Sequence, residues 1–337
     1  MRISTLVITA AALLGTNKGI AQSGNYHIVK TFHIASGGGW DYIAVSPVTD
    51  NIYVSHATQV NILNKATGDS TGVILNTTGV HGIAFAPEFK KGFTSNGKLN
   101  TATVFDLYTN AVLGEIKTGE NPDAIMYDAF TKKVYVCNGR SKELTVINPA
   151  NNEVIKTIAL GGKPETPVSD GAGKIYVAIE DKSEIAVINT KTWTVENNWK
   201  TGTGTSPSGL AIDTKTNRLF AGCDNKKLVV MDALNGKIVK ELPIGDGCDG
   251  VVFDPGEKTI FSSNGEGTLT VIKEKSANAY EVEQVPTQKG ARTIAVDERT
   301  HLVYMPTADF APAMAGGEPH KKRGTVPGTF RVLVVGK

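Results

Sequence analysis

The stretch VYVCNGRSKELTVIN (residues 134–148) reads as a strand, a polar turn and a second strand. β-Branched, aromatic and aliphatic residues dominate its two ends, whereas Asn, Gly, Arg, Ser and Lys fill its centre. Residues of the first kind favour strands, and most of the second kind favour turns. Looser versions of the stretch occur six more times, with the aromatic residue aligned at Tyr53, Phe93, Tyr135, Tyr176, Phe220, Phe261 and Tyr304.

The spacings between these aromatic residues are 40, 42, 41, 44, 41 and 43 residues. A period of 40–45 residues built from short strands is typical of β-propeller blades. Helical solenoids of similar period need apolar stripes at a spacing of 3.6 residues, which this sequence lacks. The sequence therefore predicts an all-β fold, a seven-bladed β-propeller with four antiparallel strands, A to D, in each blade.

The two ends of the chain are expected to complete one blade together. The last repeat stops after its strand C, FRVLVV (residues 330–335), and YHIVKTFHI (residues 26–34) is a strand with no repeat of its own. If the N-terminal strand serves as strand D of blade 7, the ring closes and no sheet edge stays free. Residues 22–337 are therefore predicted to form a single domain.

The N-terminus has the layout of a secretory signal peptide. Arg2 precedes a short apolar stretch, and small residues follow, with an expected cleavage site after Ala21. About 13 apolar residues are too few to span roughly 30 Å of hydrocarbon, so we expect no membrane insertion. The sequence predicts that residues 1–21 are removed and that the mature protein is periplasmic or secreted.

The charge balance argues against two classes of partner. The chain has 35 Lys and Arg and 33 Asp and Glu, and Arg2 and Lys18 fall within the expected signal peptide. A mature chain without basic excess is not expected to bind nucleic acid or a membrane surface. We expect a monomer whose partner is a small molecule or a protein of the cell envelope.

The repeats resemble a known family. KVYVCN (residues 133–138) and NIYVSH (residues 51–56) are similar to the YVTN β-propeller repeat, and GGGWDYIAV (residues 37–45) and TQKGARTIAVD (residues 287–297) resemble its exported YncE-like subgroup. The resemblance covers nearly the whole mature chain and implies a seven-bladed propeller, but it implies no established reaction. The chain departs from the pattern at Pro167, which is expected to shorten strand A of blade 4.

Antiparallel strands reverse at every turn, so strand A begins on the face where strand B ends, called here the top face. If strand A is innermost, its first residues encircle the mouth of the central channel. This mouth ring is Asp41, His81, Asp123, Glu165, Ser208, Asp249 and Arg292. The B–C loops add His56, Asn96, Asn138, Arg140, Glu180, Asp224, Asn264 and Glu266 on the same face. These polar side chains predict a site for a small ligand, a cation or a protein partner.

The acidic residues of the mouth ring need compensation, because like charges in a channel repel one another. Water, raised carboxyl pKa values, pairing with Arg292 or Arg140, or a bound cation would each supply it. One interpretation is a water-filled channel whose charges are structural. The other is a binding site.

Oxygen donors dominate the top face and suit hard cations. We therefore predict Ca²⁺ or Mg²⁺ as the possible cofactor, with Asp41, Asp123 and Asp249 as ligands. His56 and His81 keep zinc or manganese open.

Three functions are compatible with these residues. A binding or scaffold protein of the cell envelope comes first, because the resemblance covers nearly the whole mature chain and the sequence shows no catalytic constellation, HExxH and the P-loop included. The alternative is a metal-assisted hydrolase of lactonase type, with the same metal ligands, His81 as general base and Arg292 as oxyanion partner. A redox role like that of cytochrome d1-type propellers is third, since no C-x-x-C-H haem motif is present.

Three further features leave alternatives open. The long B–C loop of blade 7 (residues 307–330) is expected on the top face, as a lid or as a solvated excursion. Trp40 either stacks on a ligand or packs between blades. Cys223 and Cys248 form a disulfide if any pair does, and otherwise all three cysteines are separate thiols.

Overall fold

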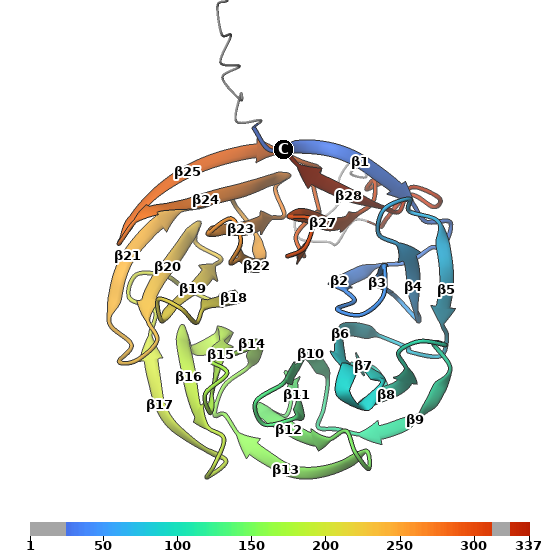
Figure 1. The fold of residues 1–337 in the computed structure, drawn as a ribbon, viewed down its shortest axis with the longest axis horizontal. Coiled ribbons are helices and arrows are strands. Elements are labelled where there is room, and N and C mark those ends of the chain that lie inside the picture. Colours follow the sequence, from blue (N-terminus) through green and yellow to red (C-terminus); the bar gives the residue numbers. More distant parts are fainter. Residues whose placement is uncertain (1–24, 312–323) are drawn as a thin grey trace, which may run out of the picture.

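Seven four-stranded antiparallel sheets form a closed ring around a central channel in the computed structural model, which describes residues 25–311 and 324–337 (Figure 1). The strand order within each sheet follows A to D from the channel outwards. The predicted seven-bladed β-propeller is therefore confirmed. The expected signal peptide, residues 1–21, lies outside the described residues.

Most strands are six or seven residues long. The A strands are β2 (Trp40–Val45), β6 (Val80–Ala86), β10 (Pro122–Asp128), β14 (Pro164–Ser169), β18 (Pro207–Asp213), β22 (Cys248–Asp254) and β26 (Ala295–Asp297). The B strands are β3 (Asn51–His56), β7 (Lys91–Asn96), β11 (Lys133–Asn138), β15 (Lys174–Ile179), β19 (Arg218–Cys223), β23 (Thr259–Asn264) and β27 (Leu302–Thr307).

The outer half of each blade completes the sheet. The C strands are β4 (Gln59–Asn64), β8 (Thr101–Asp106), β12 (Glu143–Asn148), β16 (Glu184–Asn189), β20 (Lys227–Asp232), β24 (Thr268–Ser276) and β28 (Arg331–Gly336). The D strands are β5 (Ser70–Ile74), β9 (Val112–Lys117), β13 (Glu153–Ala159), β17 (Thr194–Lys200), β21 (Ile238–Pro243), β25 (Ala279–Pro286) and β1 (His27–His33). Two short 3₁₀ turns are η1 (Pro87–Phe89) and η2 (Glu180–Lys182). No helix among the described residues is long and apolar enough to cross a membrane.

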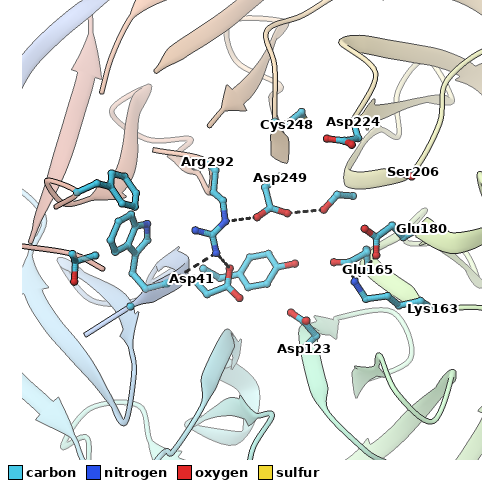
Figure 2. Close-up of a pocket in the computed structure, with 17 residues that line it drawn as sticks. Asp41, Asp123, Lys163, Glu165, Glu180, Ser206, Asp224, Cys248, Asp249 and Arg292 are labelled. Atoms are coloured by element: carbon cyan, nitrogen blue, oxygen red, sulfur yellow. Dashed lines mark hydrogen bonds and ion pairs between the residues drawn. The ribbon is translucent and has the colours of Figure 1, made fainter. Parts of the chain in front are cut away.

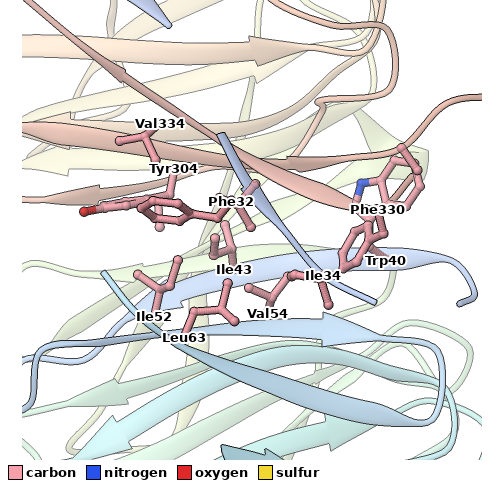
Figure 3. Close-up of a cluster of buried hydrophobic side chains, with 13 residues drawn as sticks. Phe32, Ile34, Trp40, Ile43, Ile52, Val54, Leu63, Tyr304, Phe330 and Val334 are labelled. Atoms are coloured by element: carbon pink, nitrogen blue, oxygen red, sulfur yellow. The ribbon is translucent and has the colours of Figure 1, made fainter. Parts of the chain in front are cut away.

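The ring closes as the sequence predicts. β1 pairs antiparallel with β28 as strand D of blade 7, with Phe32 opposite Val332, so the first and last strands lie side by side (Figure 1). Phe32 packs into a buried apolar cluster that also includes Tyr304 of blade 7 and Ile52 of blade 1 (Figure 3). The N-terminal strand therefore joins the first and last blades through both hydrogen bonds and apolar contacts.

The repeated aromatic residue is buried at the boundary between neighbouring blades. All seven members are at most 1% exposed. Three tyrosine hydroxyls also donate a hydrogen bond to the turn after strand C of the next blade. The pairs are Tyr53 to Asn110 Oδ1 (2.8 Å), Tyr176 to the Ala233 carbonyl (2.7 Å) and Tyr304 to the Lys65 carbonyl (3.1 Å). The aromatic residue therefore recurs once per repeat because each blade uses it to pack against the next blade.

Blade 4 corrects the expectation about Pro167. Strand β14 keeps six residues, and Pro167 stands opposite Val177 in the ladder. A register shift between Pro164 and Pro167 accommodates the missing amide donor, because a β-bulge leaves one residue unpaired.

The short A strand is instead β26 of blade 7, with three residues. The residues before it bond to neighbouring blades rather than to β27. Thr293 Oγ1 donates to the Asp41 carbonyl at 2.5 Å, and Ser263 Oγ donates to the Arg292 carbonyl.

Candidate ligand-binding site at the channel mouth

A β-bulge at the start of strand A positions the mouth ring in six of the seven blades. In blade 3, Pro122 pairs with Asn138 and the next pair in register is Ile125 with Val136, so Asp123 lies within the shift. The same shift holds Asp41, His81, Glu165, Ser208 and Asp249. A bulge bends the strand and turns a side chain away from the ladder. The repeat therefore presents one side chain per blade to the channel.

The mouth ring surrounds a cavity of about 770 Å³ on the top face (Figure 2). Six of its seven members line the cavity: Asp41, Asp123, Glu165, Ser208, Asp249 and Arg292. Glu180 and Asp224, from two B–C loops, also line it. The cavity falls in the size range of small-molecule sites, which is about 300–1,000 Å³.

Arg292 forms one charged group with its neighbours. Its Nε lies 2.6 Å from Asp249 Oδ2, and its Nη2 lies 3.6 Å from Asp41 Oδ1. Ser208 donates to the other oxygen of Asp249 at 2.8 Å. Although burial opposes the charge, the two carboxylates raise the pKa of the guanidinium. Arg292 is thus held between two carboxylates, as the dashed lines of Figure 2 show.

His81 connects two acidic members of the ring. Its Nδ1 lies 2.5 Å from Asp41 Oδ2 and 3.7 Å from Asp123 Oδ1. Burial lowers the pKa of the imidazole, but the hydrogen bond to Asp41 and the charge of Asp123 outweigh it, and the net pKa is raised. This group of three differs from the predicted metal set, because Asp249 is paired with Arg292 and His81 lies beside Asp41 and Asp123 instead.

A second charged group lies across the cavity in blade 4. Lys163 Nζ is 2.7 Å from Glu165 Oε1 and also bonds Glu180. The two carboxylates raise the pKa of Lys163 despite its partial burial. Lys163 was not among the predicted residues. Aligning the repeats two positions before the mouth ring would have found it, because the other blades carry Gly39, Gly79, Asn121, Ser206, Gly247 and Gly290 there.

Two carboxyl groups of the mouth hold their protons unusually strongly. Burial, with repulsion from Asp41 and Asp249, raises the pKa of Asp123 to about 6 against the attraction of His81. Burial, followed by the charge of Asp123, raises the pKa of Glu165 to about 8 in spite of Lys163. The mouth therefore relieves part of its negative charge by binding protons.

Replacement of Glu165 tests this electrostatic strain. Because its folded pKa lies above that of the unfolded chain, Glu165 contributes stability below pH 4.5 that is lost as the pH rises through 8. Glu165→Gln stays neutral at every pH. At pH 8 its free energy of unfolding, measured with urea, should exceed that of the wild type by a few kcal/mol, and the difference should be smaller at pH 5. The exposed Glu266→Gln serves as control. An equal difference at both pH values would contradict a raised pKa.

Tyr42 is the second residue that sequence reasoning missed. The other blades carry Gly82, Ala124, Thr166, Gly209, Gly250 and Thr293 at this repeat position. The one large side chain extends from blade 1 to pack against the apolar cluster of blades 3 and 4, and it lines the cavity. Burial, with the negative charges of Asp123 and Glu165 next, raises the pKa of its phenol well above the usual value.

Three predicted asparagines are structural. Each ends strand B, is buried, and donates from Nδ2 to a threonine of strand C in its own blade. The pairs are Asn96 with Thr103 (2.8 Å), Asn138 with Thr145 (2.8 Å) and Asn264 with Thr270 (2.9 Å). These amides serve the sheet and do not line the cavity.

Three other predicted residues also stay outside the cavity. His56 is buried, bonds Ser36 Oγ at 2.6 Å and stacks on Phe330 with ring centroids 3.8 Å apart. Burial lowers the pKa of its imidazole, so it is a neutral packing residue. Arg140 and Glu266 are exposed on the top face and do not line the cavity.

The described part of the blade 7 insertion forms a wall of the cavity. Its two ends are joined by a β-bridge between Phe310 and Thr325, and both residues line the cavity. Trp40 packs between Phe310 and Phe330, with ring centroids 5.9 and 5.6 Å away, and also borders the cavity. The predicted top-face position is thus confirmed for these residues. The HKKR segment (residues 320–323) lies outside the described residues.

The three cysteines are free and buried. The disulfide considered between Cys223 and Cys248 is therefore not formed in this structure. The Cys223 thiol faces the Ala221 carbonyl at 3.7 Å, whereas Cys248 Sγ lies 3.8 Å from the Gly250 carbonyl. Burial raises the pKa of both thiols to about 12, so they are neutral packing groups.

Comparison with known proteins supports the fold alone. The chain matches no protein-family model and no curated protein sequence. Among solved structures, it is similar to Kuenenia stuttgartiensis hydrazine synthase, with TM-score 0.70 and 16% identity over 81% of this chain and 94% of that chain. It is also similar to U3-55K, with TM-score 0.73 and 8% identity over 90% of this chain and 97% of that chain. At these identities the similarity shows that the chain has a β-propeller fold and shows nothing of its function, because one fold hosts many unrelated functions.

Proposed function

We propose that this protein is an exported binding protein that holds a small organic cation, such as an amine or a quaternary ammonium compound, in the mouth of its central channel. The observation that carries the proposal is the composition of the cavity wall. Six carboxylates line it, namely Asp41, Asp123, Glu165, Glu180, Asp224 and Asp249, against two cationic side chains, Lys163 and Arg292. A concave, acidic wall attracts positive ligands and raises their local concentration.

The aromatic part of the wall favours an organic cation over a simple ion. Tyr42, Trp40 and Phe310 all border the cavity. Cations bind over the faces of such rings, and aromatic groups recognise quaternary ammonium compounds in this way. The raised pKa values of Asp123 and Glu165 support the same interpretation, because they reflect unfavourable negative charge that a bound cation would offset.

The family and the location belong to the same proposal. The resemblance of the repeats to the exported YVTN-repeat propellers supports membership of that family, and the N-terminal pattern of residues 1–21 supports export to the periplasm or beyond. The intact mass of the protein recovered from its own cell envelope tests both the export of the chain and the removal of residues 1–21. A chain beginning at Gln22 is expected, and an unprocessed chain would contradict the proposed export.

Calorimetric titration of the metal-free mature protein tests the ligand class. Choline and its neutral isostere 3,3-dimethylbutan-1-ol have the same shape, so only the charge distinguishes them. We expect one saturable choline site and no binding of the neutral compound. Binding of both compounds with equal affinity, or of neither, would refute a cation site.

Two variants locate that site. Tyr42→Leu should weaken choline binding several-fold, because a cation–π contact contributes about 0.5–2 kcal/mol. Asp249→Asn should also weaken it, whereas Glu266→Gln, on the same face but outside the cavity, should not. Unchanged binding in both cavity variants would place the ligand elsewhere.

A metal-assisted hydrolase is the second candidate, and the position of His81 between two carboxylates favours it. An ion held by those side chains would activate water for attack on an ester or lactone. Hydrolysis of a lactone panel by the zinc-loaded protein, abolished in His81→Gln, is the expected result for this function. A zinc-loaded protein that leaves every lactone intact would exclude it.

A further inference from the structure

We propose that Asp41, His81 and Asp123 form a binding site for a divalent transition-metal ion of the zinc or manganese kind, held between three consecutive blades. The proposed metal site goes beyond the organic-cation site, since it concerns a metal ion and adds His81, which does not line the cavity, to Asp41 and Asp123, which do. It stands on the position of three potential ligand atoms, on their chemical type and on the groups that fix them.

The positions suit a single ion. One potential ligand atom from each of the three side chains lies within 4.8 Å of the other two. Asp41 Oδ2 and His81 Nδ1 are 2.5 Å apart, and His81 Nδ1 and Asp123 Oδ1 are 3.7 Å apart. Donors that each lie about 2.1 Å from one ion are about 3–4 Å from one another. Small side-chain rotations therefore bring all three into a first coordination shell.

The repeat creates this arrangement. The three residues hold the same place in blades 1, 2 and 3, at the bulge that opens strand A. Successive blades thus supply successive ligands, and no loop has to close over the ion. Among the described residues, this is the only group of three or more His, Cys, Asp or Glu side chains with ligand atoms so close together.

The donor types select the metal. Imidazole nitrogen suits zinc and other first-row transition ions, whereas Ca²⁺ and Mg²⁺ prefer oxygen ligands alone. One imidazole with two carboxylates therefore favours zinc or manganese over the hard cations expected from the sequence. Asp41 and Asp123 also line the cavity, which leaves the solvent side open for water or a ligand to complete the coordination.

Surrounding groups hold the ligands in place. Arg292 Nη2 lies 3.6 Å from the Asp41 oxygen that does not face His81, and the Asp41 amide donates to Ser55 Oγ at 3.1 Å. Gly97 gives the imidazole room, because a Cβ there would lie 2.7 Å from His81 Nε2. Such outer contacts orient metal ligands and strengthen their affinity.

The chain provides a matched control on another pair of blades. His301 Nδ1 lies 2.7 Å from Asp254 Oδ2, in the same kind of contact as His81 with Asp41. Within the described residues, no third ligand joins this pair at the distances seen around His81. A pair supplies two donors and is expected to bind zinc far more weakly than the group of three.

The test is calorimetric titration of chelator-treated mature protein with Zn²⁺, in the wild type and in His81→Gln, Asp123→Asn and His301→Gln. One Zn²⁺ per chain is expected for the wild type and for His301→Gln. Loss of a single ligand should weaken binding by at least about tenfold, because loss of an outer-shell partner alone costs 10–100-fold. Zn²⁺ should also raise the melting temperature of the wild type and of His301→Gln only.

Three results would overturn the inference: no Zn²⁺ bound by the wild type, unchanged affinity in both His81→Gln and Asp123→Asn, or equal loss in His301→Gln. If one ligand variant does not fold, the other carries the test, with its melting curve in chelator as the check. The choline titration uses metal-free protein, so either site can fail while the other is retained.

Discussion

A chain that lacks residues 26–34 should fail to give a stable monomer. The deletion removes β1, the strand that completes blade 7, and leaves β28 as an unpaired edge with the apolar sequence RVLVV. It also removes Tyr26, Phe32 and Ile34, each at most 5% exposed. Burial of a large apolar side chain contributes about 1.5–3 kcal/mol, so the loss approaches the whole stability of a typical domain, about 5–15 kcal/mol.

Light scattering after size exclusion and a thermal scan measure the result. We expect aggregation, or a melting transition far below that of the full chain, because a free apolar edge pairs with other chains. Adding a synthetic peptide of residues 26–34 should restore the transition. Phe32→Ala should destabilise much more than Val29→Ala, whose side chain is 36% exposed. A truncated monomer with an unchanged melting temperature would contradict closure by β1.

Tyr135→Ala is expected to cost about 3–5 kcal/mol of unfolding free energy, the usual range for a buried aromatic residue. Tyr135 is 0% exposed and belongs to the cluster shared by blades 3 and 4, where its ring lies 6.1 Å from that of Trp193. Removing the ring leaves a cavity between two blades, and the surrounding rigid sheets cannot close it.

Urea unfolding of matched variants compares the stability lost at this packing residue with the stability lost at the channel mouth. Tyr135→Phe keeps the ring and loses only the contact of its hydroxyl with Thr131 Oγ1, so it should cost about 1 kcal/mol. Asp249→Asn changes a partly exposed side chain at the mouth and should leave the midpoint nearly unchanged. If Asp249→Asn unfolded as readily as Tyr135→Ala, the mouth would be part of the structural core.

The blade period was readable from the sequence because one buried aromatic residue recurs at each blade boundary. Tyr53 and Tyr304 carry the same packing function 251 positions apart, and the repeat makes that visible without a structure. Closure of the ring by the N-terminal strand was predictable too, because the last repeat lacks a strand D and residues 26–34 form a strand with no repeat of their own. The position of the mouth ring was also predictable, although in each blade with a bulge its member is the second residue of strand A and not the first.

The partners within the mouth were not predictable in the same way. An asparagine at the end of strand B can bind a ligand or hydrogen-bond to a neighbouring strand. The hydrogen bond from Asn138 to Thr145 shows that it does the second, and the sequence does not reveal this bond. The choice of His81 over Asp249 beside Asp41 depends on side-chain direction, which the sequence pattern does not encode. Tyr42 could have been noticed, since it is the one large side chain at its repeat position.

A crystal structure of the mature protein grown with saturating choline tests the proposed mouth site most directly. We predict that the ammonium group lies in the cavity on the top face, within about 6 Å of the Tyr42 ring and facing the carboxylates of Asp123 and Glu165. A cavity that holds only water under these conditions, or choline bound at another place on the propeller, would contradict it.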